Sequence, residues 1–190
     1  MLKELILKNR SYRRFDENAR LSVEELAGFV EMARLSPSSR NMQPLKYILS
    51  WEKEKNDKIF PALAWAGYLK EWPGPEKGER PSAYIIMLGD SAIMPAYSID
   101  PGIAAQSILL GAVEKGFGGC IIGTVRKEDL RLALGIPEKM DVLYVIAIGK
   151  PVEEVVIEPI NPDGDVRYWR DEKKVHHVPK RNLEDLILKL

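Results

Sequence analysis

Residues Asp100–Thr124 read DPGIAAQSILLGAVEKGFGGCIIGT, and we expect the rest of the chain to be organised around this stretch. Asp100 is a suitable N-cap for a helix. Apolar residues then cover most of the helical circumference, as far as Gly116, where a left-handed C-terminal residue is expected. Such a helix belongs inside a core or an interface. A short buried strand is predicted at Cys120–Ile122, and Gly123 after it would let another group approach the backbone closely.

The composition is that of one globular domain, which we predict over residues 1–190, because 45% of the residues are hydrophobic and 29% are charged. The net charge of zero provides no global field for nucleic acid, so no nucleic-acid partner is expected. The longest apolar run, Val142–Ile148, is too short to cross a membrane, and the first residues lack a signal-peptide apolar region. The single cysteine, Cys120, favours a reducing compartment, so we expect a cytoplasmic protein without a membrane partner.

Hydrophobic spacing and end signals predict the other elements. Helices are expected near the N-terminus, after the capping box at residues 22–25, over residues 53–70 and over residues 127–134, and strands at 45–51, 82–88 and 142–148. Residues 152–166 look extended, and Asn182 should cap a last amphipathic turn over residues 183–190. Because this tail has little to pack on within its own domain, we predict that it wraps a partner subunit.

Two segments are rich in groups that bind polar ligands. Asn9–Phe15 (NRSYRRF) carries three arginines and a serine hydroxyl, which could grip a phosphate, although a basic turn can equally be solvated surface. Ser36–Pro44 (SPSSRNMQP) offers hydroxyls, two amides and a guanidinium in one loop between a helix and a strand. Basic residues recur near the other end of the chain, at Lys180 and Arg181.

Several common catalytic patterns are missing from the sequence. It contains no G-x-G-x-x-G, P-loop, H-E-x-x-H or C-x-x-C pattern, so we predict no metal site and no standard dinucleotide fingerprint. Cys120 lies in an apolar strand and is expected to be buried and inert. We therefore predict that no protein side chain is a catalytic residue and that a cofactor carries the chemistry.

Taken in order, these segments resemble the signature of the nitroreductase family of FMN-dependent enzymes. Asn9–Phe15 is similar to R-S-x-R-x-F, Ser36–Pro44 to S-P-S-x-x-N-x-Q-P, and Gly116–Gly123 to G-x-G-x-x-x-I-G, while Gly149–Pro151 and Pro179–Arg181 match the last two landmarks. The resemblance implies an α+β fold with a mostly antiparallel central sheet flanked by helices. It also implies a homodimer in which a C-terminal extension, residues 152–190, wraps the partner subunit.

The resemblance further implies two FMN sites at the dimer interface. Arg10, Ser11 and Arg13 would hold the phosphate and ribityl chain, with Lys180 and Arg181 joining them from the far end of the chain. The partner subunit would supply the flavin contacts Pro37, Ser38, Ser39, Asn41 and Gln43. Ile122 and Gly123 would lie against the flavin ring, with a backbone N–H near its N5 atom.

The middle of the chain departs from the family pattern. Many members have an Asn and a Lys that touch the flavin pyrimidine, but residues 63–68 here read LAWAGY. The sequence therefore does not identify which residues would hold the pyrimidine edge. Trp65, Tyr68 and Trp72 could instead wall the substrate pocket. The Pro- and Gly-rich segment Trp72–Pro81 could be a lid or a simple connection.

The implied function is an FMN-dependent NAD(P)H oxidoreductase with a ping-pong mechanism. NADH or NADPH would give a hydride to bound FMN and leave, and a small electron-poor acceptor such as a nitroaromatic or a quinone would then take the electrons. One alternative is a specialised family branch for flavin breakdown or reductive dehalogenation. Another is a flavin-binding carrier or sensor without efficient turnover. The sequence distinguishes neither NADH from NADPH nor one acceptor from another.

Overall fold

The computed structural model describes residues 1–97 and 99–188. Its helices are α1 (Leu2–Lys8), α2 (Val23–Arg34), α3 (Lys53–Ile59), α4 (Asp100–Glu114), α5 (Lys127–Leu134) and α6 (Leu183–Leu186), with short 3₁₀ turns at Ser39–Asn41 and Phe60–Ala62. Its strands are β1 (Phe15–Asp16), β2 (Leu45–Ser50), β3 (Ala83–Asp90), β4 (Gly118–Ile122), β5 (Met140–Pro151), β6 (Val155–Pro159), β7 (Trp169–Arg170) and β8 (His176–Lys180).

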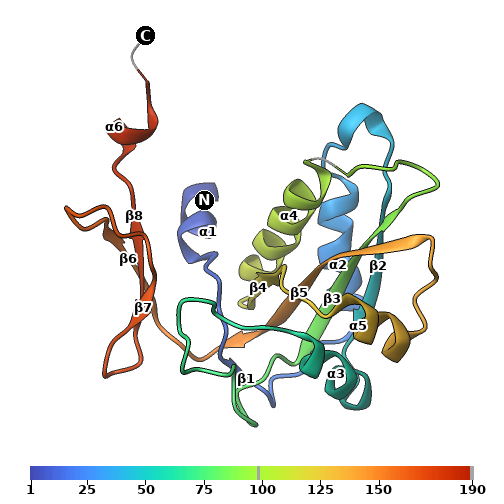
Figure 1. Ribbon diagram of the computed structural model, residues 1–190, viewed down its shortest axis with the longest axis horizontal. Helices are drawn as coiled ribbons and strands as arrows, with labels where there is room; N and C mark the ends of the chain where they lie inside the picture. The colour runs from blue at the N-terminus through green and yellow to red at the C-terminus, as the bar shows by residue number, and fades with distance from the viewer. Residues whose placement is uncertain (98, 189–190) are drawn as a thin grey trace.

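The main sheet is antiparallel and is built around β5, the strand with the near-continuous apolar run. The strand order is β1-β5-β3-β2, and β4 also pairs with β5 (Figure 1). β5 pairs with β3 and with β4, and its last residues pair with β1. This arrangement confirms the predicted α+β fold with a mostly antiparallel sheet.

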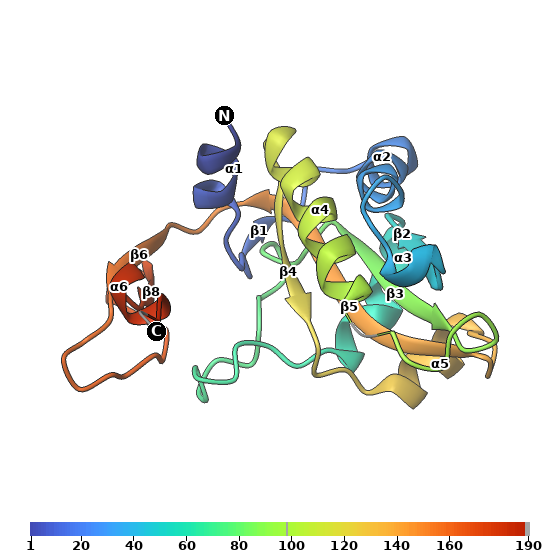
Figure 2. The ribbon, with the colours of Figure 1, turned by 90° about the horizontal axis from the view of Figure 1, so that it is seen from above.

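Helices cover both faces of this sheet, and alternation along β3 explains why. Ile85 and Met87 pack against α2 and α4, whereas Tyr84 and Ile86 pack on the opposite face against a cluster that includes residues of α3 and α5. All four side chains are at most 1% exposed, so β3 is buried on both faces. In Figure 2, α4 lies between α1 and α2.

The predicted core helix is α4, with one difference at its start. Gly116 has a φ of 81°, which confirms the left-handed residue expected after the helix. Asp100 is the first residue of the helix rather than its N-cap, which is Ile99. The carboxylate of Asp100 is therefore not used on its own helix, and it accepts hydrogen bonds from the Ser36–Pro44 loop instead.

The prediction of a helix over residues 53–70 is wrong in its second half. α3 ends at Ile59, and a single 3₁₀ turn follows before the chain becomes extended. Leu63 pairs with Val125, and the N–H of Ala64 donates to the carbonyl oxygen of Thr124 over 3.0 Å. This pairing with a segment far along the chain replaces the helical hydrogen bonds that the local pattern favours.

The tail is not a single extended segment. β6 and β8 pair in parallel and β7 pairs with β8, which gives a small sheet that stands apart from the main one in both views (Figures 1 and 2). α6 is shorter than the expected last turn, whose end at residues 189–190 lies outside the described residues. The wrapping of a partner stays a prediction. None of the helices within the described ranges has the length and apolarity to cross a membrane.

Candidate functional site

The first basic motif lies against the start of β4. The N–H of Tyr12 donates to the carbonyl oxygen of Gly119 over 3.0 Å, and Ser11 forms an isolated bridge with the same glycine. The Ser11 side chain is exposed. The guanidinium of Arg10 donates to the carbonyl oxygen of Ile6, while its Nε is buried and has no partner among the described residues. An arginine and a serine hydroxyl are therefore held together at one end of β4.

β4 leads from this point to the pair predicted to face a flavin ring. Gly119 and Ile122 are three residues apart, so about 10 Å of strand separates them. Gly123 is exposed, and a Cβ added there would come no closer than 3.6 Å to Tyr144, so its backbone is open to an approaching group. The strand thus connects a basic end with an open backbone end.

The second motif, the Ser36–Pro44 loop, lies on the other side of α4. The side chain of Asn9 donates to Gln106 over 3.3 Å, whereas the hydroxyl of Ser36 lies 2.7 Å from that of Ser107. Consecutive helical residues point about 100° apart, so these contacts fall on different faces of α4. The structure therefore does not bring the two motifs together within one chain.

The loop itself is exposed at most of its predicted contact residues. Pro37, Asn41 and Gln43 are exposed, while Ser38 and Ser39 are half-buried. A cavity of about 510 Å³ lies beside the loop, bounded by α2, β2 and the start of α4. Pro37, Ser38 and Gln43 line this cavity, but none of the other predicted cofactor residues does.

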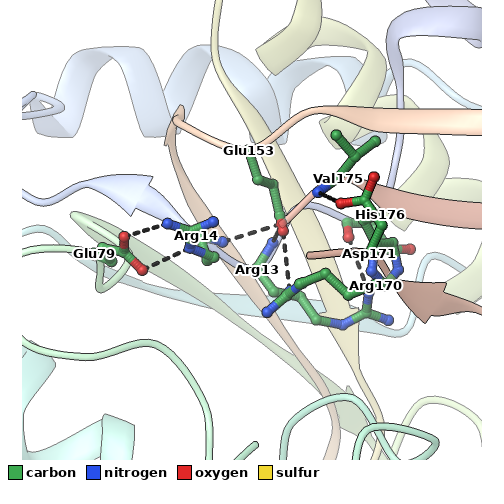
Figure 3. A network of polar contacts seen from close by, with 9 residues as sticks. Arg13, Arg14, Glu79, Glu153, Arg170, Asp171, Val175 and His176 are labelled. Carbon is green, nitrogen blue, oxygen red and sulfur yellow. Dashed lines mark hydrogen bonds and ion pairs between the residues drawn. The ribbon is translucent and has the colours of Figure 1, made fainter. Parts of the chain in front are cut away.

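Arg13 lies against the tail (Figure 3). Its guanidinium donates to the carbonyl oxygen of Ser11 over 3.1 Å, lies 3.3 Å from the ring Nε2 of His176, and sits 4.8 Å from the centre of the Tyr168 ring. Arg13 is 9% exposed. These contacts fix the tail to the first motif within the single chain, and the placement of Arg13 on a phosphate stays a prediction.

Glu153, just after β5, joins the same cluster from the side of the tail. Its carboxylate accepts hydrogen bonds from the backbone N–H groups of Arg13 and Arg14 and pairs with the guanidinium of Arg170 over 3.2 Å. The Glu153 side chain is 1% exposed. Arg14 in turn forms a bidentate pair with Glu79, so the cluster also ties down the Trp72–Pro81 segment (Figure 3).

His176 gives this cluster a pH dependence. Burial, followed by the positive charges of Arg13 and Arg170, lowers the pKa of His176 from 6.5 to about 4. The neutral ring fits the geometry, because Nε2 accepts from Arg13 and a protonated ring would set two donors against each other. Between pH 6.5 and 4 the unfolded chain binds more protons at this residue, so the stability that His176 contributes is lost as the pH falls through that window.

We therefore expect wild-type protein to lose about 2 kcal/mol of unfolding free energy at this residue between about pH 7.5 and about pH 5. His176→Gln keeps an acceptor for Arg13 but does not titrate. The measurement is urea unfolding of both proteins at both pH values. If the difference in stability between the two proteins is the same at both pH values, the assignment of a depressed pKa to His176 is contradicted.

Lys180 and Arg181 lie at the end of β8 and directly after it, and both are exposed. Neither forms an ion pair with a described residue, and no hydrogen bond connects them to Arg10 or Ser11. Lys180 is four residues along β8 from His176, or about 13 Å of strand. In this chain the contact between the first motif and the tail is made by Arg13 and His176. The convergence of the two basic clusters on a phosphate stays a prediction.

The three predicted pocket residues lie in different environments. Trp65 is 8% exposed and packs in the core, with its ring 5.9 Å from that of Phe60. Trp72 packs against the same cluster and carries the guanidinium of Arg170 at 4.6 Å from its ring. Tyr68 is 52% exposed and lies 4.9 Å from the Tyr168 ring. Its exposure makes Tyr68 the best placed of the three to meet a ligand.

Two residues that hold the motifs, Glu153 and Asp100, carry no clear signal in the sequence. Glu153 stands in an extended acidic pair with Glu154, which carries no sign that one side chain is buried and the other exposed. The sequence pattern predicts Asp100 only as a helix cap. Asp100 precedes a proline at the start of a buried helix, and this position is the one local sign of its role. The Ser38 and Ser39 groups that it holds are 62 and 61 residues away in the chain, beyond the reach of local patterns.

The chain belongs to the nitroreductase family, whose model matches residues 6–150. A protein of Archaeoglobus fulgidus is 28% identical over 159 residues, which cover 80% of this chain and 86% of that protein. The FMN reductase (NADPH) of Bacillus subtilis is 27% identical over 165 residues, which cover 78% of this chain and 65% of that protein. The FMN-dependent nitroreductase of Clostridium difficile R20291 superimposes with a TM-score of 0.64 at 26% identity, covering 78% of this chain and 87% of that one.

Proposed function

We propose that this protein is an FMN-dependent oxidoreductase that takes electrons from NADH or NADPH and passes them to a small electron-poor acceptor such as a nitroaromatic or a quinone. The observation that carries the proposal is β4, with Arg10 and Ser11 at its basic end and the open backbone of Gly123 at the other. The names of the C. difficile and B. subtilis relatives support FMN and a nicotinamide donor. Bound FMN would supply the acceptance and donation of hydride.

The residues of the chain fit this cofactor in type and spacing. Arg10 would donate to the phosphate from its guanidinium, whose buried Nε has no partner among the described residues, and Ser11 would donate its exposed hydroxyl. Ile122 and Gly123 would lie against the ring and offer a backbone N–H to it. The roles of these residues are to bind, to orient the ring and to place a donor where negative charge develops.

The second motif would reach this site from another copy of the chain. Because α4 separates Asn9 from Ser36, a site that uses both motifs is complete only in a homodimer. We accordingly propose that the Ser36–Pro44 loop of a second copy completes the ring contacts, and that the tail contributes to the interface. Sedimentation of flavin-loaded protein should give a dimer at every practical dilution, and a flavin-loaded monomer would overturn the shared site.

The phosphate grip predicts a difference between two flavins. Each charge-assisted contact with the phosphate contributes about 1.5–3 kcal/mol, so Arg10→Ala should weaken FMN binding by on the order of ten- to a hundred-fold. Riboflavin lacks the phosphate, and its affinity should barely change. Arg181→Ala tests the contribution of the tail in the same way. The measurement is titration of flavin-free protein with both flavins at fixed salt.

Arg20→Ala is the control for these titrations, because Arg20 is exposed and lies outside the motif. It should bind both flavins like wild type. An Arg10 variant that binds FMN normally, or loses affinity for riboflavin to the same extent, would show that the phosphate lies elsewhere.

Turnover separates an enzyme from a flavin-binding carrier or sensor. We expect flavin-loaded protein to oxidise NADH or NADPH in steady state when menadione or a nitrofuran is supplied. Initial rates at varied donor and acceptor should give the parallel reciprocal plots of a ping-pong mechanism. Flavin that is reduced slowly or not at all by both nicotinamides would favour the carrier or sensor instead.

A further inference from the structure

The Ser36–Pro44 loop holds three non-glycine residues in a left-handed backbone conformation. The φ angles are 53° at Arg40, 56° at Asn41 and 51° at Gln43. Residues with a Cβ visit this region infrequently, and such conformations persist where the surrounding structure over-determines them. Another part of the chain must therefore hold this loop in place. The residue that does so also sets the direction of the side chains predicted to bind the flavin.

Asp100 provides that contact. Its carboxylate accepts a hydrogen bond from the Ser38 hydroxyl over 2.5 Å and another from the backbone N–H of Ser39 over 2.9 Å. The Ser38 oxygen in turn accepts the backbone N–H of Gln43 over 2.9 Å. One carboxylate therefore reaches both ends of the left-handed segment, directly at Ser39 and through Ser38 at Gln43.

The chemistry of Asp100 suits this role. It is 2% exposed, and no Lys, Arg or His among the described residues forms an ion pair with it. Burial alone opposes its ionisation, but the hydrogen bonds from Ser38 and Ser39 hold the pKa of the carboxyl below its usual value. The positive end of the α4 dipole adds to this stabilisation. The side chain thus stays an acceptor with two donors aimed at it.

We propose that Asp100 is a positioning residue for the flavin site, which it serves by holding Ser38, Ser39 and Gln43 in the conformation that presents them to the cofactor. This inference rests on the proposed function, because those three residues are cofactor contacts only if the protein binds a flavin. Asp100 itself does not touch the cofactor. Its effect passes through the loop, and because α4 begins at Asp100, the loop is tied to the core helix.

The first test uses flavin-free protein and hydrogen exchange. Asp100→Asn is nearly isosteric but removes the charge and one acceptor. We expect the amides of residues 39–43 to exchange about tenfold faster in this variant, while those of β4 exchange at the wild-type rate. Asp129→Asn is the matched control, since Asp129 is also an acid in the first turn of a helix but is exposed and pairs with Arg126. Unchanged exchange at residues 39–43 would overturn the proposal.

The second test is titration of the same proteins with FMN and riboflavin. Asp100→Asn should weaken both flavins by the same factor, about tenfold, because the loop is not expected to touch the phosphate. Ser38→Ala removes the link to Gln43 and should weaken both flavins too, and adding it to Asp100→Asn should cost little more. Ser38→Ala alone also serves as the second variant if Asp100→Asn does not fold.

The outcomes separate this proposal from the proposed function. Wild-type protein that binds neither flavin would overturn the function, and the positioning role with it, whatever the exchange rates are. Wild-type protein that binds FMN, together with an Asp100→Asn variant of faster loop exchange but normal affinity for both flavins, would overturn the positioning role alone.

Discussion

Replacement of Glu153 with alanine is expected to lower the free energy of unfolding by about 3–5 kcal/mol, because removal of one partner from a buried ion pair leaves the other charge uncompensated. The Arg170 guanidinium would lose its carboxylate while remaining largely buried, and the N–H groups of Arg13 and Arg14 would lose their shared acceptor. Burial already lowers the pKa of Arg170, and the charge of Glu153 opposes that shift. Glu153→Ala removes the negative charge that offsets the burial of the Arg170 guanidinium.

Glu154→Ala is the matched control, because Glu154 is the adjacent residue of the same type and is exposed. It should change the stability by less than about 0.5 kcal/mol. Urea unfolding of the three proteins at neutral pH measures both effects. A Glu153 variant as stable as the Glu154 variant would show that the carboxylate does not hold the tail and the first motif together.

The second large effect is expected for Gly119→Ala, at about 3 kcal/mol of lost stability. The new Cβ would lie 2.4 Å from the carbonyl oxygen of Ala147 and 2.7 Å from a methyl group of Leu109. The backbone cannot move away easily, because Gly119 pairs with Ile148 in the β4–β5 ladder and Ser11 rests on its other side. Closely packed cores accept such an overlap only by displacing neighbouring strands.

Gly123→Ala separates folding from cofactor binding on the same strand edge. Its Cβ would make only an ordinary contact of 3.6 Å with Tyr144, so thermal unfolding of the flavin-free protein should match wild type. Flavin affinity should nevertheless fall, because the added methyl group would stand where the ring is proposed to lie. If Gly119→Ala melts like wild type, the packing around β4 is not as described; if Gly123→Ala binds FMN normally, the ring lies elsewhere.

Each of the two motifs is held by hydrogen bonds to one buried carboxylate. Glu153 fixes the backbone of the first motif at Arg13 and Arg14, and Asp100 fixes the second at Ser38 and Ser39. Each carboxylate is distant in sequence from the segment that it holds. In the proposed site the motif residues would contact the cofactor, and these two acids would fix the backbone conformation that presents them.

Sequence patterns predicted the features that local forces determine. The helix over Lys127–Leu134 matches α5 at both ends, because Gly135 takes the left-handed conformation that ends it. The capping box at Ser22 and Glu25 is formed as expected. The apolar run of Val142–Ile148 became the central strand because residues this apolar are stable where both faces are covered.

The failures share a physical cause, which is pairing between distant segments. Residues 63–70 left the predicted helix because Leu63 and Ala64 pair with Thr124 and Val125. The tail became a sheet through the parallel pairing of β6 with β8, which no local pattern announces. The contacts of Arg13 with His176 and Tyr168 also join distant segments, so no local pattern announces them, and the placement of Arg13 on a phosphate stays a prediction.

The central claim is that this chain binds FMN, and the visible spectrum of the purified protein tests it most directly. We expect a yellow protein with the absorption bands of oxidised flavin, from which acid releases FMN in a ratio of one per chain. Protein purified without flavin should take up added FMN to the same ratio. A colourless protein that takes up no added FMN would contradict the account.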